Sequence, residues 1–222
     1  MKAHDDEDEM TGDTAPALRA DARRNVDALL RAATDVFTES GVDAPMRTIA
    51  AKAGVGVGTV YRHFPQRSDL IKAIIRRVVA AQVDAASALA EKHEPGEALA
   101  LWMLRLVDLV ATKRGLGPAL HSGDLAYKAL PDFVLGQLTP ALRGLLDDAA
   151  KSGAIRDNVD VSDLLNAGLR LATPASDGDT AQARRMMALL IDGLSYRSSV
   201  PPVNKRASRV KAAGGGKITS KH

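Results

Sequence analysis

Residues 47–65 contain two short segments with helical spacing, separated by a glycine-rich turn. Gly54 follows the first segment, where a glycine can end a helix in the left-handed conformation without a Cβ penalty. Val60 and Phe64 lie four residues apart in the second segment and predict an apolar stripe on its inner side. The outer side is left with hydroxyl, aromatic and cationic side chains, which are Thr59, Tyr61, Arg62 and His63. The spacing therefore predicts a helix-turn-helix whose second helix has the kind of face that a DNA major groove accepts.

Helical periodicity dominates the rest of the chain. From Val26 to Phe37, apolar residues recur at i, i+3, i+4, i+7 and i+11, which predicts one apolar helix face. Pro45 suits the first turn of the second helix, and Ser68 and Asp69 suit the cap of the fourth. No alternating segment is long enough for a strand, so we expect an all-α chain. In the N-terminal part we expect a helix over 21–40, a second helix starting at 43–45, and then the helix-turn-helix. Further helices are expected over 68–92, over 97–113 as a buried central helix, and within 115–130 as a short helix. The last expected helices cover 131–151, which Gly136, Pro140 and Gly144 weaken or bend, 162–173 and 180–197.

Composition excludes several classes of site. The chain has no Cys, so neither disulfides nor thiolate metal sites are possible. The histidines His93 and His121 have no partner at metal-ligand spacing, and no nucleophilic or paired-carboxylate arrangement stands out, so we expect no metal, no cofactor and no enzyme activity. The longest apolar stretch, 98–111, contains Arg105 and Asp108 and is too short to cross a membrane. The acidic N-terminus lacks the pattern of a secretory signal, so a cytoplasmic protein is expected.

Charge is distributed unevenly along the 222 residues. Residues 1–15 have a net charge of about −5, and residues 200–222 have six Lys and Arg without an acid. Segment 17–76 has a net charge of about +4, and a basic surface favours polyanions through counterion release. We therefore expect a disordered acidic tail over 1–17, a DNA-binding domain over 18–67, a helical regulatory and dimerisation domain over 68–198 and a disordered basic tail over 199–222.

The N-terminal region closely resembles the DNA-binding domain of the TetR family of transcriptional regulators. The resemblance covers roughly residues 19–76 and is carried by an ordered set: Ala32-Ala33, Phe37, Gly41-Val42, Ile49-Ala50, Ala53-Gly54-Val55, the run from Thr59 to Pro65, and Leu70. The rest of the chain matches in layout, and the run 111–116 is similar to C-terminal domains of actinobacterial members. The resemblance implies a three-helix DNA-binding domain, a larger helical ligand-binding and dimerisation domain, and a homodimer that binds a palindromic operator in double-stranded DNA.

The resemblance also implies which side chains contact DNA. Gly58, Thr59 and Tyr61 would face the groove or its rim, and Tyr61 and His63 would reach phosphates. Further contacts to the backbone or the minor groove would come from Arg47, Thr48, Arg67, Arg19, Arg23 and Arg24. For all of these, the alternative is an ordinary solvated helix face.

Two positions depart from the family pattern. Gly56 stands where many members have a Ser or Thr that contacts phosphate, and Ala44-Pro45 replaces a capping Thr. Neither position is given a role. Because Val57 and Gly58 are small and apolar, specificity is expected to depend on Thr59, on methyl contacts and on DNA shape.

Two further sites are expected in the C-terminal part. Candidates for a ligand pocket between helices are Trp102, Met103, His121, Tyr127 and Phe133, with plain core packing as the alternative. The resemblance implies a four-helix dimer interface built from the last two helices, and the candidates are Leu165, Leu169, Met187, Leu190, Ile191 and Leu194. Burial within the monomer is the alternative for this second set.

The leading hypothesis for function is a sequence-specific repressor that a small apolar or amphipathic effector releases from its operator. The effector would enter near Trp102 and shift the helix that starts at Ser68. The alternative is a sequence-tolerant architectural DNA-binding protein without a ligand switch, helped by the basic tail. A phosphate-binding glycine loop at 54–58 is disfavoured, because it lacks the Gly-Lys-Ser/Thr ending and a preceding strand.

Overall fold

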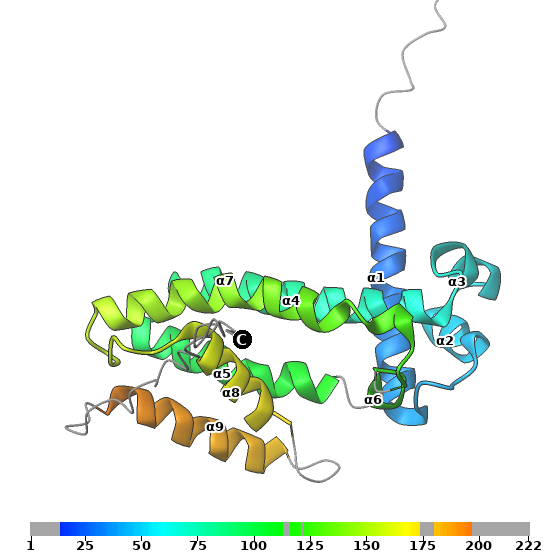
Figure 1. Cartoon of the computed structure of the whole chain (residues 1–222). Coiled ribbons are helices and arrows are strands. Elements are labelled where there is room, and N and C mark those ends of the chain that lie inside the picture. The colour runs from blue at the N-terminus through cyan, green and yellow to red at the C-terminus, as the bar shows by residue number, and fades with distance from the viewer. Residues whose placement is uncertain (1–13, 113–115, 121, 174–179, 197–222) are drawn as a thin grey trace, which may run out of the picture.

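The computed structural model describes residues 14–112, 116–120, 122–173 and 180–196, with the side chains of the first helix described from Arg24 onward. Within these ranges every regular element is a helix, and the expected all-α fold class is confirmed. Figure 1 shows a small N-terminal group, α1–α3, at one end of a larger bundle formed by the later helices. The helix α4 starts beside the small group and runs into the bundle, so it belongs to both parts.

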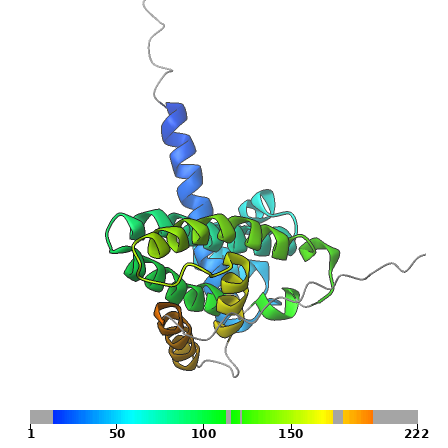
Figure 2. The ribbon, with the colours of Figure 1, turned by 60° about the vertical axis from the view of Figure 1, so that its left-hand side comes forward.

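The N-terminal group consists of α1 (Thr14–Ser40), α2 (Met46–Ala53) and α3 (Val57–His63). Helix α1 packs on α2 and on α4, and its N-terminal half projects away from the bundle in both ribbon views (Figures 1 and 2). It begins seven residues before the expected start at residue 21. Pro16 falls in its first turn, where the missing N–H of proline has no helical partner to lose. The predicted apolar face is buried, with Leu29, Ala33 and Phe37 in the core.

Two predicted helix starts differ slightly from the structure. Pro45 is the N-cap of α2, with extended backbone, rather than its first helical residue. Helix α4 (Arg67–Ala90) is capped by Gln66, whose N–H donates to the Asp69 carboxylate at 3.2 Å. Lys72 lies 2.9 Å from Asp69 and holds the pKa of that carboxyl below its usual range. Such boundary errors are small because several polar residues near a helix start can serve as the cap.

The bundle is built around α5. Its helices are α4, α5 (Pro95–Thr112), α6 (Gly117–Leu120), the 3₁₀ turn η2 (Leu125–Tyr127), α7 (Leu130–Lys151), α8 (Val161–Leu171) and α9 (Thr180–Ser195). Helices α4 and α7 lie against each other and against α5, while α8 and α9 also pack on α5. Leu99, Met103 and Leu106 of α5 are fully buried, as expected for the predicted central helix.

Helix α7 runs unbroken through Pro140, so the expected weakening does not divide it. A Cβ atom on Gly136 or Gly144 would meet nothing within 4 Å, so both glycines border open space. Over the described ranges, the chain has no helix with the length and apolar character needed to cross a membrane.

Candidate DNA-binding site

The turn between α2 and α3 depends on one left-handed glycine. Gly54 has φ 69° and ψ 27°. Its N–H donates to the carbonyl of Ala51 at 3.2 Å, and the N–H of Val55 donates to that of Ala50 at 3.0 Å. These bonds satisfy carbonyls at the end of α2 that have no partner within the helix. The turn is thereby closed in a few residues, and α3 starts directly after Gly56.

Burial of two side chains fixes the orientation of α3. Val60 is fully buried and Phe64 nearly so, and both belong to the core that includes Ile49 of α2 and Phe37 of α1. The predicted inward stripe is confirmed. The opposite side of α3 must therefore face solvent.

The solvent side of α3 carries most of the predicted contact residues. Gly58, Tyr61 and His63 are exposed, with Tyr61 at 50% exposure, and Thr59 is half-buried at the edge of this face. Arg62 is also exposed, with Nε 3.3 Å from the carbonyl of Gly58 and Nη2 3.4 Å from Thr59 Oγ1. Hydrogen bonds of this length are weak, so the guanidinium is easily redirected to a phosphate or a guanine edge.

Two residues of this face were not among the predicted contacts. Arg62 was recognised as outward-facing but received no role. Val57 is 45% exposed at the first position of α3, where an apolar side chain can contact a thymine methyl group. The signal for both was present in the sequence: each is three or four residues from a predicted contact and therefore shares its helix face.

Helix α2 contributes a second exposed group. Arg47 and Thr48 lie in its first turn and are exposed. Lys52, near the other end of α2, is paired with Glu39 at 2.7 Å and lies 3.9 Å from Asp35, both on α1. The start of α2, where the helix dipole is positive, is therefore its better-placed surface for a phosphate.

Arg67 has protein partners. It is half-buried, and its Nη1 donates to the backbone carbonyls of Val42 and, at 2.7 Å, Ala44 in the connection between α1 and α2. The guanidinium also lies 6.0 Å from the centre of the Phe37 ring. The structure thus gives this side chain a role in joining the start of α4 to the DNA-binding helices, which differs from the predicted phosphate contact. Arg19 and Arg23 lie in α1, and their side chains are outside the described part of the chain.

These different surroundings predict opposite behaviour for two arginines. Arg67→Ala leaves two carbonyls of buried residues without their donor, so we expect the free energy of unfolding to fall by about 1–3 kcal/mol. Arg47→Ala removes an exposed cation, so stability should change by less than about 0.5 kcal/mol. Thermal denaturation without DNA measures the first effect.

The DNA affinity of the Arg47 variant should depend less steeply on salt than that of the parent, because fewer phosphates are neutralised. Titrations of one DNA duplex at several salt concentrations measure this slope. An unchanged melting temperature for Arg67→Ala, or an unchanged slope for Arg47→Ala, would contradict the assignment of the corresponding residue.

The predicted ligand-pocket residues that the structure describes lie on three different elements, α5, η2 and α7. Trp102 is fully buried, its Nε1–H donates to the carbonyl of Gln82 at 2.9 Å, and Met103 is buried beside it in α5. Tyr127 is buried near the start of α4, where loss of water and nearby Asp124 raise the pKa of its hydroxyl. Phe133 lies under the Arg76 guanidinium, 5.8 Å away, and His121 is outside the described residues.

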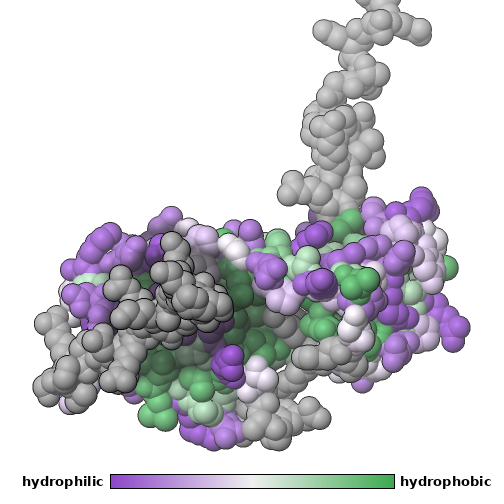
Figure 3. Space-filling model, viewed as in Figure 1, coloured by the Kyte–Doolittle hydropathy of each residue, from purple (hydrophilic) through white to green (hydrophobic). Residues whose placement is uncertain are grey.

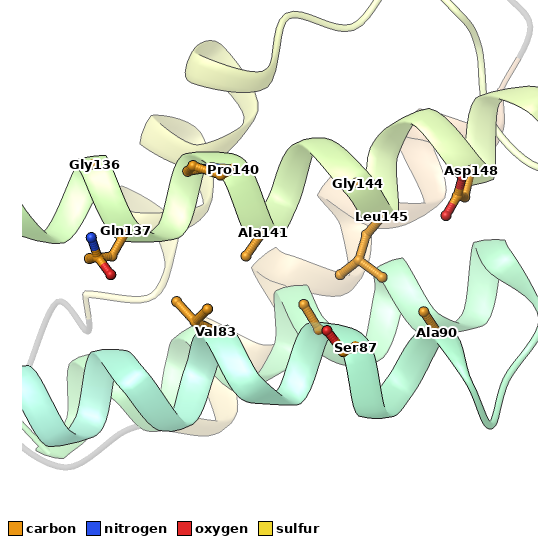
Figure 4. Close-up of a pocket in the computed structure, with 11 residues that line it drawn as sticks. Val83, Ser87, Ala90, Gly136, Gln137, Pro140, Ala141, Gly144, Leu145 and Asp148 are labelled. Atoms are coloured by element: carbon orange, nitrogen blue, oxygen red, sulfur yellow. The ribbon is translucent and has the colours of Figure 1, made fainter.

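A cleft lies elsewhere, between α4 and α7. It has a volume of about 420 Å³. Figure 4 shows side chains of α4 and α7 facing each other across it. The lining is mostly small or apolar, with polar groups at Ser87, Gln137 and Asp148; the remaining residues are Val83, Ala86, Ala90, Gly136, Pro140, Ala141, Gly144 and Leu145. The glycines of α7 keep the two helices from filling this space.

The predicted dimer residues divide into two groups. Leu165, Met187 and Leu194 are buried in the single chain, while Leu169, Leu190 and Ile191 are half-buried. The largest exposed apolar side chains of α9 are Met186 at 41% and Leu189 at 71%. Hydrophobic surface is visible over the region of α8 and α9 in Figure 3. Three of the six predicted dimer residues are thus buried within the single chain. The exposed apolar side chains of α9 are its neighbouring residues Met186 and Leu189.

The described residues form helices only, and an exposed helix follows a tight turn, which is the architecture of a helix-turn-helix DNA-binding protein. Two family profiles match it. One is described as bacterial regulatory proteins, tetR family, and matches residues 29–74; the other is described as transcriptional regulator SbtR-like, C-terminal domain, and matches residues 94–196.

Solved structures and curated proteins agree with these profiles. A TetR transcriptional regulator from Streptomyces coelicolor is 38% identical, with 76% of this chain and 97% of that chain covered and a TM-score of 0.66. A TetR transcription regulatory protein from Mycobacterium vanbaalenii is 34% identical, with 80% of this chain and 98% of that chain covered and a TM-score of 0.64. HTH-type transcriptional regulators from Staphylococcus aureus are 41% identical over 61 residues, so the chain spans about a third of the length of these curated relatives.

The chain belongs to the TetR family and is a DNA-binding transcriptional regulator. The family is one of regulators and not of enzymes, in agreement with the sequence prediction.

Proposed function

We propose that the protein is a homodimeric repressor, released from a palindromic operator by a small apolar or amphipathic effector. The observation that carries this proposal is the course of α4. This helix is bonded at Arg67 to the connection between α1 and α2, and it packs along its length on α5 and α7. A displacement of α4 in the bundle is therefore transmitted to the DNA-binding helices.

Each of the two predicted domains has its own proposed role. Residues 18–67 bind DNA through α3 and the start of α2, with Gly58, Thr59, Tyr61, His63, Arg47 and Thr48 as the contacts. Residues 68–198 bind the effector and dimerise. The protein would act in the cytoplasm, where its DNA is. Two recognition helices held about one helical turn apart add their binding free energies, which is the physical reason for a dimer.

The exposed face of α9 supports dimerisation. Met186 and Leu189 are apolar and exposed, and Leu190 beside them is half-buried, so a contact between two copies would remove apolar area from water. The buried residues Leu165, Met187 and Leu194 would hold α8 and α9 in place beneath that face.

The cleft between α4 and α7 is the proposed effector site. Its volume of about 420 Å³ lies within the range of small-molecule sites, and its apolar lining has a few polar groups that could orient a ligand. An effector that wedges α7 away from α4 would change the position of α4. The switch requires that the effector bind the DNA-free arrangement more tightly than the DNA-bound one.

The DNA half of the proposal is tested by selecting the purified full-length protein against a pool of random duplexes at near-physiological salt. Recovery of one palindromic motif is expected. Retention of DNA without an enriched motif would favour the architectural alternative, and failure to retain any DNA would contradict both.

The effector half is tested with the recovered operator and a panel of apolar and amphipathic metabolites. At least one compound should weaken operator binding, and Gly144→Leu, which fills the cleft, should abolish its effect. A compound that acts equally on the Gly144→Leu variant does not use the cleft. Ala81→Leu, at an exposed position of α4 outside the cleft lining, controls for the addition of a leucine side chain to the bundle.

A further inference from the structure

A second arginine of α4, ten residues beyond Arg67, also reaches the DNA-binding group. Arg77 Nη1 donates to the backbone carbonyl of Asp27 in α1 at 3.1 Å. Its Nε lies 3.8 Å from Asp27 Oδ1, so a hydrogen bond and an ion pair join it to the same residue. Both side chains are partly exposed, at 35% for Arg77 and 54% for Asp27. Exposed pairs contribute little to stability, so this one affects the relative position of two helices more than it affects the free energy of unfolding.

The two arginines attach α4 to the DNA-binding group at separate points. Arg67 donates to the carbonyls of Val42 and Ala44 in the connection between α1 and α2, whereas Arg77 is bonded to α1 itself. Ten residues of helix place these attachments about 15 Å apart along α4. One attachment fixes a position and leaves rotation about it free, whereas a second one at this distance also fixes an angle. The pair of attachments therefore holds α1–α3 in one orientation relative to α4.

Apolar packing determines this angle less well than the arginines do. Helix α1 crosses α4 instead of running along it in both ribbon views, so their contact is confined to a short stretch (Figures 1 and 2). The buried side chains of this part of α4 are aliphatic, namely Leu70, Ile71 and Ile74. Aliphatic contact is non-directional, whereas the hydrogen bond of a guanidinium has a preferred direction. Packing thus holds the two helices together, and Arg77 opposes their rotation.

The orientation of the DNA-binding group decides where α3 lies. Figure 1 shows α3 to one side of the start of α4, so rotation of the group at this point displaces α3. In a dimer on DNA, two copies of α3 must enter the major groove about 34 Å apart. Each base pair added between the half-sites increases this distance by about 3.4 Å and turns the second half-site by about 35° around the duplex. A changed spacing is therefore tolerated only if the DNA-binding group can rotate.

We propose that Arg77 and Asp27 determine the half-site spacing that the protein accepts. Arg77 is a positioning residue in this role, because it acts on α3 through the angle between α4 and α1 and not through a contact with DNA. The inference rests on the proposed homodimer and its palindromic operator. It adds to them a determinant of specificity that lies outside the recognition helix.

Affinity for operators of different spacing tests this role. The operator recovered by selection is prepared with one or two base pairs added to or removed from its centre, and the full-length protein is titrated with each duplex. The parent should bind the altered duplexes much more weakly than the original. Arg77→Ala should reduce this discrimination several-fold, chiefly through a gain of affinity for the altered duplexes. Its melting temperature should stay at the parental value, because the lost pair is exposed.

Two further variants make the test specific. Arg76→Ala removes the same side chain one position earlier, where it lies over the Phe133 ring of α7, and it should keep the parental discrimination. Exchange of the pair, Asp27→Arg with Arg77→Asp, restores opposite charges across α1 and α4. The exchanged protein should recover most of the discrimination that Arg77→Asp alone loses. If Arg77 instead contacted a phosphate, its loss would lower affinity equally at every spacing, which would overturn the proposal.

The angle can also be measured without DNA. The chain has no Cys, so Thr38→Cys on α1 and Asp84→Cys on α4 provide two exposed sites for spin labels, with Arg77 between Asp84 and the start of α4. Dilution with unlabelled protein restricts pulsed EPR to distances within one chain. The parent and Arg76→Ala should give one narrow distance distribution, and Arg77→Ala should give a wider one.

The two measurements separate this inference from the proposed function. An unchanged distance distribution in Arg77→Ala would overturn the inference, since packing alone would then fix the angle. A wider distribution with parental discrimination between spacings would also overturn it, because the angle would not determine the spacing. Failure to recover a palindromic operator would contradict the proposed function and the spacing role together, while a wider distribution in Arg77→Ala would still support the fixed angle.

Discussion

Replacing Tyr61 with Ala should remove most of the affinity for the operator and leave the fold intact. Tyr61 is 50% exposed on the outer face of α3, while Val60 on the inner face holds the helix in the core. The substitution therefore removes an exposed side chain, the proposed DNA contact, without opening a cavity. A hydrogen bond from a hydroxyl to a charged phosphate contributes about 1.5–3 kcal/mol.

The proposed dimer would double this effect. Each operator would be bound by two copies of α3, so the loss of one contact per protomer should cost about 3 kcal/mol or more, which is at least a hundredfold in Kd. The measurement is operator binding at fixed salt, with the melting temperature of the free protein as the check on folding. The stability should change by less than about 0.5 kcal/mol, since the site is on the surface.

Tyr61→Phe separates the hydroxyl from the ring. If the phenol binds phosphate, Phe should lose nearly as much affinity as Ala. If the ring itself packs on sugar or a base methyl group, Phe should bind nearly as well as the parent. Parental affinity for both variants would show that Tyr61 belongs to a solvated face and that α3 does not bind DNA in the proposed orientation.

The local parts of the fold followed from sequence because their signals are local. The spacing of Val60 and Phe64, with Gly54 before them, determines a short helix after a left-handed turn, and both features are present. Apolar residues on nearly all sides of the segment 97–113 likewise predicted a central helix, and the α5 residues Leu99, Met103 and Leu106 are buried. Periodicity within one segment carries this information, since it depends only on residues a few positions apart.

The parts that sequence did not predict depend on long-range contacts. Arg67 bonds to carbonyls more than twenty residues away, and neither these bonds nor its half-buried position could be read from the resemblance that placed it near the DNA backbone. Gly136 and Gly144 were interpreted as weak points in a helix, whereas in the fold they border a cleft. Helix α9 has apolar residues on more than one side, so its sequence alone does not show which side packs on the core of its own chain. Met187 lies on the side that does, since it is fully buried.

Trp102 should carry the largest single contribution to stability. Its indole is fully buried, and it is the one Trp of the chain. Trp102→Ala would leave a large cavity between α4 and α5, so we expect a loss of about 3–5 kcal/mol in the free energy of unfolding. That is a large share of the roughly 5–15 kcal/mol typical of a whole domain, and the variant should be partly unfolded at moderate temperature.

A reciprocal pair of hydrogen bonds makes the site more than a packing contact. Trp102 Nε1 donates to the backbone carbonyl of Gln82 at 2.9 Å, and Gln82 Nε2 donates to the backbone carbonyl of Trp102 at 3.0 Å. Gln82 is itself buried at 3% exposure. Trp102→Phe should cost clearly less than Ala, because it retains most of the ring volume and loses one donor, which is worth about 1 kcal/mol on average.

A double-mutant cycle shows whether the two bonds act together. Gln82→Leu and Trp102→Phe each remove a different bond, so independent bonds would give additive losses. We expect the double variant to lose less than the sum, because each bond sets the spacing between α4 and α5 that the other requires. Urea denaturation of the three variants measures this coupling. Strict additivity would mean that packing alone determines the spacing of α4 and α5, and that the polar pair merely satisfies buried groups.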